Sequence, residues 1–140
     1  MQIVLKDSRH YILRFDKGEE VVAGLLEFAE LNEVKAAAFN GIGAANYAEL
    51  GFFDLEKKTY EKQVFAEEVE IISLIGNLAV LAGRPVLHVH GSFGRRDFSV
   101  VGGHVIGLRV SVTCEILLTL LDGRLERRPD SGLNLNLLYV

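Results

Sequence analysis

The pair of histidines in His88-Val89-His90 is the clearest chemical signal in the sequence. On a β-strand, residues two apart point to the same face, with their Cβ atoms about 6.6 Å apart. Two imidazoles at that spacing can converge on one metal ion, because neutral imidazole is a ligand for zinc, copper, iron and nickel. The spacing leaves one alternative open, in which both side chains only line a half-polar strand face.

A third histidine, His104, follows directly after Gly102-Gly103. Glycines let a backbone bend or approach a neighbour closely, so this pair can aim the imidazole at the same point as His88 and His90. Three histidines plus a water molecule form the open arrangement of a catalytic zinc site. We therefore expect His88, His90 and His104 to bind zinc or another divalent transition metal.

Two acidic residues lie in apolar sequence, Glu70 before Ile71-Ile72 and Glu115 after Cys114. A buried carboxylate is costly unless it is paired or ligates a metal. Each is therefore a candidate for a further ligand, for a group that orients a histidine, or for a general base, with Arg14 as a candidate partner. Arg14, Glu70 and Glu115 are the catalytic candidates. The alternative is that each carboxylate faces solvent or forms a structural ion pair.

Cys114 is the single cysteine of the chain. One cysteine excludes an intramolecular disulfide framework and a cysteine-rich zinc site. We expect Cys114 to be a small core residue, because its strand setting offers no helix N-terminus or base that would lower the thiol pKa.

Composition limits the classes of function. The 140 residues carry 15 basic and 19 acidic side chains, which gives a net charge of −4. This charge argues against a domain whose whole surface binds nucleic acid. No apolar run approaches the roughly 20 residues that span a bilayer, and residues 1–7 do not resemble a signal peptide. We expect a reduced, cytoplasmic protein with one domain over residues 1–140.

Apolar periodicity predicts the elements that position these residues. One helix is expected, because Val21, Leu25, Phe28 and Ala29 form one stripe between a candidate N-cap at Asp16 and a stop at Asn32. Strands are expected at residues 9–15, 47–53, 60–65, 69–74, 78–81, 86–90, 98–101, 105–112, 116–121 and 133–137. This pattern indicates an α+β fold with a mostly antiparallel sheet and one early helix packed on it.

Three glycine-containing segments of the chain predict a bulge, a turn or a loop. Residues 40–45, Asn-Gly-Ile-Gly-Ala-Ala, lack the third glycine and following helix of a dinucleotide-binding loop, so we expect a bulge or a close strand crossing there. Residues 83–85 favour a hairpin turn, and residues 94–97 favour a basic, solvated loop tip.

Taken in order, these motifs resemble the plants-and-prokaryotes-conserved (PPC) domain family, which plants attach to AT-hook DNA-binding segments. The resemblance extends from about Tyr11 to about Leu133. It is carried by Leu13-Arg14, Gly18-Glu19, Gly41-Ile42-Gly43-Ala44, Gly51-Phe52-Phe53-Asp54, Tyr60, residues 70–77 (EIISLIGN), His88-Val89-His90, Gly102-Gly103-His104 and Thr113-Cys114-Glu115-Ile116.

The resemblance implies an antiparallel sheet with a packed helix, assembled as a homotrimer. It also implies that His88, His90 and His104 form a metal site, usually a zinc site. The family fold is similar to that of acetolactate decarboxylase, a metalloenzyme that uses three histidines with nearby Glu and Arg residues. Family members are commonly described as DNA-binding. This chain has no AT-hook, and Glu68-Val69 replaces the Arg-Phe that precedes the Glu-Ile motif in plants.

Three hypotheses follow. The first is a trimeric, metal-binding accessory protein that binds DNA, as the family resemblance implies. The second is a metalloenzyme that acts on a small-molecule ligand at a three-histidine zinc site. The third is a structural trimerisation module without metal. The charge weakens the DNA hypothesis, because three chains at −4 carry −12.

Overall fold

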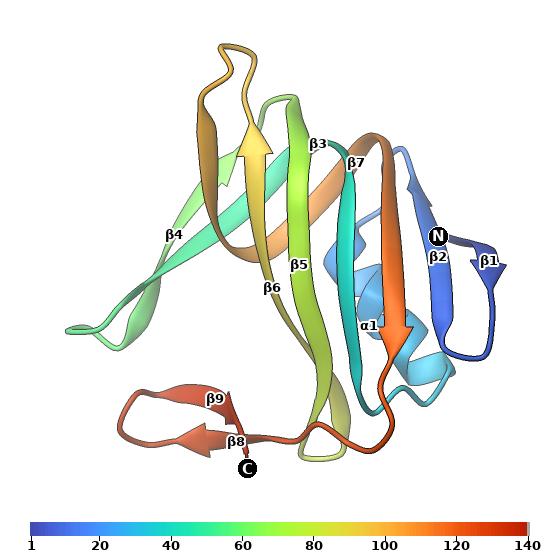
Figure 1. Ribbon diagram of the computed structural model, residues 1–140. Helices are drawn as coiled ribbons and strands as arrows, with labels where there is room; N and C mark the ends of the chain where they lie inside the picture. The colour runs from blue at the N-terminus through green and yellow to red at the C-terminus, as the bar shows by residue number, and fades with distance from the viewer. Residues whose placement is uncertain (140) are drawn as a thin grey trace.

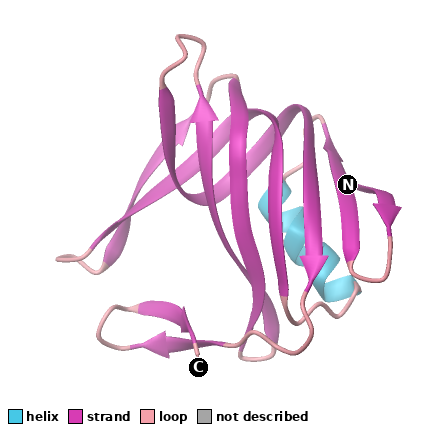
Figure 2. Cartoon of the chain, in the orientation of Figure 1, coloured by secondary structure: helices cyan, strands magenta, loops and turns pink. Residues whose placement is uncertain are grey.

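A computed structural model describes residues 1–139 and shows a strand-rich fold with one helix (Figures 1 and 2). Seven strands form one antiparallel sheet in the order β1-β2-β7-β6-β5-β3-β4, and two more form a separate hairpin. The elements are β1 (Gln2–Lys6), β2 (His10–Asp16), α1 (Val21–Leu31), β3 (Ala37–Asp54), β4 (Thr59–Phe65), β5 (Val69–Leu81), β6 (Arg84–Gly94), β7 (Val100–Leu120), β8 (Arg127–Asp130) and β9 (Leu135–Leu138). The predicted fold class is confirmed.

The sheet closes on itself through β7. Besides its pairing with β2 and β6, β7 pairs with β3, and β3 pairs in turn with β5. The four strands β3, β5, β6 and β7 therefore form a closed ring. β3 and β7 are long, 18 and 21 residues, so each pairs with different strands along its length (Figure 1). The beginning of β7 pairs with β6 and its end with β2, and the second half of β3 pairs with β4.

Four of the strands are several residues longer than the sequence pattern predicts, among them β6, which extends over Arg84–Gly94 where residues 86–90 were expected. Residues 47–53 continue the preceding small apolar stretch as β3, residues 69–74 and 78–81 form β5, and residues 105–112 and 116–121 form β7. The predicted strand at 98–101 is only partly right, because Phe98 lies in the turn before β7. Two of the breaks were wrong because glycines lie inside a strand without ending it, Gly76 in β5 and Gly102-Gly103 in β7; the break at residues 113–115 was wrong because polar residues there continue β7. β1 and β8 were not predicted.

The expected bulge or close crossing in residues 40–45 is present. The register of β3 against β5 shifts between Gly41 and Gly43. Gly43 has a φ of 155°, and a Cβ built there would lie 2.2 Å from the carbonyl oxygen of Thr113 on β7. Only a residue without a side chain allows β3 and β7 to pair this closely.

The helix begins one turn later than predicted. Its N-cap is Glu20, whose carboxylate accepts a hydrogen bond from the Ala23 backbone N–H. Asp16 is instead the last residue of β2, and its own N–H donates to the Glu19 carboxylate at 2.7 Å in the turn that follows. The predicted stop at Asn32 is confirmed, because Asn32 is the C-cap.

The core decides which strand residues face outward. Val21, Leu25, Phe28 and Ala29 of α1 are buried in one cluster that includes Val89 of β6 and Val105 of β7. Since side chains alternate along a strand, the burial of Val89 places His88 and His90 on the outer face of the sheet. In the same way, the burial of Val105 places His104 on that face.

The β8–β9 hairpin lies beside the sheet rather than within it (Figure 1). The Val80 N–H donates to the carbonyl oxygen of Leu125 at 2.8 Å, just before β8. At the other end, the Asn134 side chain donates to the carbonyl oxygen of Lys58 at 3.3 Å. The hairpin is thereby attached to the end of β5 and to the β3–β4 turn.

No helix among residues 1–139 has the length and apolar character needed to cross a membrane.

We predict that Gly43→Ala lowers the free energy of unfolding by at least about 2 kcal/mol, because the new methyl group would overlap the Thr113 carbonyl. Urea unfolding followed by circular dichroism measures the change. Gly123→Ala is the matched control. Gly123 also has a positive φ, 100°, but open space around its Cβ position, so its cost is about 1 kcal/mol. Equal losses in the two variants would contradict the close crossing.

Candidate metal centre

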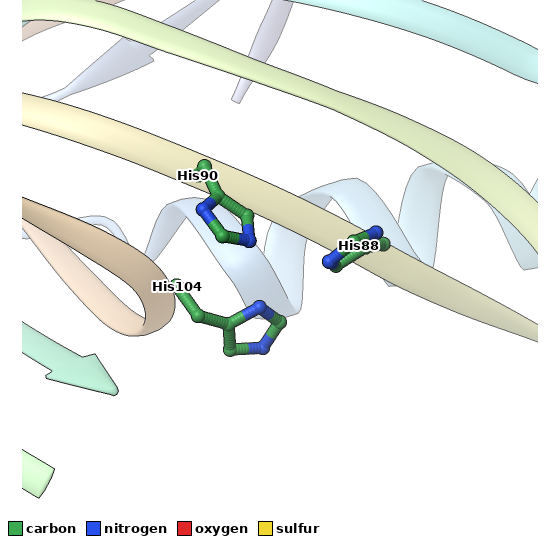
Figure 3. A group of neighbouring side chains, drawn as sticks. All are labelled: His88, His90 and His104. Carbon is green, nitrogen blue, oxygen red and sulfur yellow. The ribbon is translucent and has the colours of Figure 1, made fainter. Parts of the chain in front are cut away.

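The structure brings His88, His90 and His104 together on the outer face of the sheet (Figure 3). β6 supplies His88 and His90, and β7 supplies His104, which is the direct cross-strand partner of His90. The ring centroids are 5.1 to 5.4 Å apart, and one ring nitrogen from each residue lies within 4.8 Å of the other two.

The two glycines before His104 explain how β7 reaches this position. A Cβ on Gly102 would lie 2.7 Å from the carbonyl oxygen of Gly91 on β6. A Cβ on Gly103 would lie 3.0 Å from the carbonyl oxygen of Gly51 on β3. β7 therefore passes tightly between two neighbouring strands, and this close passage sets His104 opposite His90.

Tyr60 of β4 stacks on the imidazole ring of His104. The two rings are stacked, with centroids 4.8 Å apart and an interplanar angle of 29°. Tyr60 lies across Gly51, where a Cβ would come within 2.7 Å of the tyrosine ring. Tyr60 contributed to the family resemblance, but the sequence did not connect it with the histidines, because β4 pairs with β3 and not with β6 or β7.

Burial keeps two of the histidines neutral. It lowers the pKa of His104 to about 4, with smaller contributions from the charges of His88, His90 and Arg127. Burial also lowers the pKa of His88, followed by the charges of Arg127 and His90. A metal ligand must be neutral imidazole with a free lone pair, so both shifts favour metal binding near neutral pH.

The His104 ring also has an unsatisfied atom. Its Nδ1 is buried and has no hydrogen-bond partner among the described residues. In Figure 3, one ring nitrogen of His104 points toward His88 and His90. Ligands at about 2.0–2.1 Å from a tetrahedral zinc ion lie roughly 3.3 Å from one another, so small side-chain movements bring this set into range. The donor set fits a divalent transition metal.

A pocket of about 280 Å³ opens beside the histidines. Its lining includes His88, His104 and Tyr60, together with Arg127 of β8 and Leu135 and Leu137 of β9. Sequence reasoning missed Arg127. The signal for it was weak, because the short strands of the hairpin carry no distinctive motif and only the fold places them beside β4 and β6.

The catalytic candidates Arg14, Glu70 and Glu115 lie away from the histidines. Glu70 and Glu115 are exposed, in line with the alternative of solvent-facing carboxylates. Glu115 is the cross-strand partner of Arg14, but the Arg14 Nε donates to Asp16, with 2.9 Å between nitrogen and oxygen. None of the three belongs to the group of potential metal ligands.

Cys114 is fully buried in the core, as the sequence indicates. Burial, followed by the negative charge of Glu115, raises the pKa of its thiol to about 12. The thiol is therefore protonated at neutral pH and takes no part in the site.

Several solved structures are similar to this chain. A proposed DNA-binding protein from Bacteroides thetaiotaomicron is 29% identical with a TM-score of 0.93, covering 96% of this chain and 94% of its own. A metal-containing protein from Archaeoglobus fulgidus is 33% identical with a TM-score of 0.89, covering 100% and 99%.

A more distant likeness concerns the fold alone. Acetolactate decarboxylase from Bacillus subtilis has a TM-score of 0.57 at 16% identity, and the match covers 87% of this chain and 57% of the enzyme. No curated protein matches the chain.

The family model of the Plants and Prokaryotes Conserved (PCC) domain matches residues 3–122. This span contains the three histidines and the main sheet, and it ends before the β8–β9 hairpin. PCC and PPC denote the same family, so the resemblance carried by the ordered motifs is confirmed. The chain therefore belongs to the Plants and Prokaryotes Conserved domain family.

Proposed function

We propose that the protein binds zinc or another divalent transition metal through His88, His90 and His104. The observation that carries the proposal is the convergence of three imidazole nitrogens within 4.8 Å, with the buried His104 Nδ1 left without a partner in residues 1–139. The similarity to a metal-containing protein from Archaeoglobus fulgidus supports it.

The pocket beside the histidines favours a small-molecule role for this centre. Three protein ligands leave a tetrahedral metal with one open position, which is the arrangement of catalytic rather than structural zinc sites. A zinc ion held there would supply Lewis acidity toward a carbonyl group or a water molecule. His88 and His104 are half-buried where they line this pocket, whereas His90 is exposed. A metalloenzyme is therefore the second candidate function.

We predict that the wild-type protein binds about one zinc ion per chain and that the double variant His88→Ala/His90→Ala binds none. The variant loses two of three ligands on the outer face while the core is untouched. Elemental analysis after zinc loading and dialysis gives the content. His10→Ala is the matched control, because His10 is exposed on β2 beside Asp7 and should leave zinc binding unchanged.

Equal zinc content in the wild type and the double variant would contradict the site. A wild type that retains no zinc would instead favour the structural trimerisation module. Circular dichroism of both variants verifies that each remains folded.

We also propose that the protein is a homotrimer. Support comes from apolar side chains on the outer face of β3, β5 and β7, which are 38 to 65% exposed: Ile42, Ile75, Val112 and Leu117. Ile75 and Leu117 are both cross-strand partners of Asn40, so they lie in one row. Such a face gains free energy when a second copy covers it.

We predict a solution mass of about 46.5 kDa for the wild type, three times the 15.5 kDa chain. Val112→Lys places a charge in the apolar face and should reduce the mass to that of one chain. Light scattering coupled to size exclusion measures both. Leu31→Lys is the control, because Leu31 is 77% exposed at the end of the helix and away from this face. A wild type of 15.5 kDa would contradict the trimer.

DNA binding has weaker support. The similar protein from Bacteroides thetaiotaomicron is a proposed DNA-binding protein. In this chain, however, the net charge is −4, and Arg95 at the basic loop tip is paired with Glu67 at 3.0 Å. Few cations therefore remain at this tip to neutralise phosphates, which supply most of the affinity for DNA.

We predict that the zinc-loaded protein does not retard a 30-base-pair duplex at 150 mM NaCl, whether the duplex is AT-rich or GC-rich. An electrophoretic mobility shift at increasing salt measures binding. Retardation that persists at 150 mM NaCl would establish DNA binding despite the acidic charge.

A further inference from the structure

Arg127 is an arginine without a carboxylate partner. None of the ion pairs among residues 1–139 includes it, whereas the neighbouring Arg124 and Arg128 both lie within 4.0 Å of the Glu126 carboxylate. Its side chain lines the pocket of about 280 Å³ together with His88 and His104. Arg127 lies beyond residues 3–122, so the family model does not include this wall of the site.

Two neutral groups fix the orientation of the Arg127 guanidinium. Its Nη2 donates to the side-chain oxygen of Asn77 at 3.0 Å, and its Nη1 donates to the carbonyl oxygen of Asn136 at 2.8 Å. Asn77 is the cross-strand partner of His88. Through Asn77, the guanidinium is therefore connected to the position opposite His88 on β6. The two hydrogen bonds orient the positive charge of Arg127 but do not neutralise it.

The Arg127 guanidinium has donors that these two hydrogen bonds do not use. A guanidinium has five N–H donors, and these two hydrogen bonds use two of them. The Arg127 Nε is buried and has no hydrogen-bond partner among the described residues. A buried donor without an acceptor is unfavourable, and arginine presents its N–H groups in a fork that matches the two oxygens of a carboxylate.

The pocket limits the size and character of the acceptor. Leu81, Val86, Leu135 and Leu137 contribute apolar walls, and Tyr60 contributes an aromatic one. A volume of about 280 Å³ is slightly below the usual range for ligand pockets, so it suits a molecule of few atoms. One cation in an apolar setting favours a singly charged organic carboxylate over a doubly charged phosphate.

We propose that this pocket binds a small organic carboxylate, with its carboxylate on Arg127 and its apolar part against β9, beside the three-histidine centre. The proposal rests on the proposed function in one respect, since a bound metal adds positive charge on the other side of the ligand. Arg127 is then a binding residue that selects anions, and the hairpin is part of the ligand site.

The test uses ¹⁵N-labelled full-length protein with propionate as the probe, both metal-free and zinc-loaded. We expect propionate to shift the Arg127 Nε–H resonance in a saturable manner, with tighter binding in the zinc-loaded form. Arg127→Gln keeps a polar side chain but loses the charge and the fork, and should weaken propionate binding at least tenfold by calorimetry. Arg128→Gln is the matched control, because Arg128 stacks on Tyr139 outside the pocket and should leave binding unchanged.

Each outcome of this test either supports or overturns the carboxylate site. Absence of a saturable shift in both forms, or equal propionate affinity in the wild type and Arg127→Gln, would overturn the proposal. Tighter binding of inorganic phosphate than of propionate would overturn the assignment to a carboxylate. If the protein binds no zinc but the metal-free form still binds propionate through Arg127, the carboxylate site stands and the metal centre fails. Thermal unfolding of each variant verifies that the hairpin and the sheet remain folded.

Discussion

The architecture depends on the close approach of β7 to β6 and β3, which residues without side chains make possible. Gly43 and Gly102 each lie where a Cβ would meet a neighbouring carbonyl oxygen within 3 Å. With these contacts, β3, β5, β6 and β7 close into a ring, and His104 lies directly opposite His90. The position of the histidine cluster therefore depends on this close backbone packing, together with the buried side chains of β6 and β7 that hold the two strands in register.

The sequence predicted well what is local in the structure. The spacing of His88 and His90 indicated a common face, and the apolar stripe of Val21 to Ala29 indicated a buried helix, because both follow from the period of one element. Strand continuity was harder, since Gly76 and Gly102 are typical of turns but here lie inside β5 and β7. Tyr60 and Arg127 were beyond prediction as site residues, because their positions depend on pairings between distant parts of the chain.

Two residues that line one pocket each have an unsatisfied buried group. His104 has a buried ring nitrogen without a partner in the described chain, and Arg127 has a buried Nε in the same condition. Unsatisfied buried polar atoms are uncommon in folded proteins and cost stability. Both atoms belong to residues that line the same pocket.

The β8–β9 hairpin contributes residues to the pocket but has few contacts with the sheet. The hairpin is held to the sheet by a few hydrogen bonds, in which the Val80 N–H, the Arg127 guanidinium and the Asn134 side chain donate, and it contributes no residue to the buried core cluster. Substitutions in it therefore change the charge and shape of one pocket wall at little cost to folding. The histidine strands are held by packing in the core, so a change in the hairpin alters the pocket without moving the histidines.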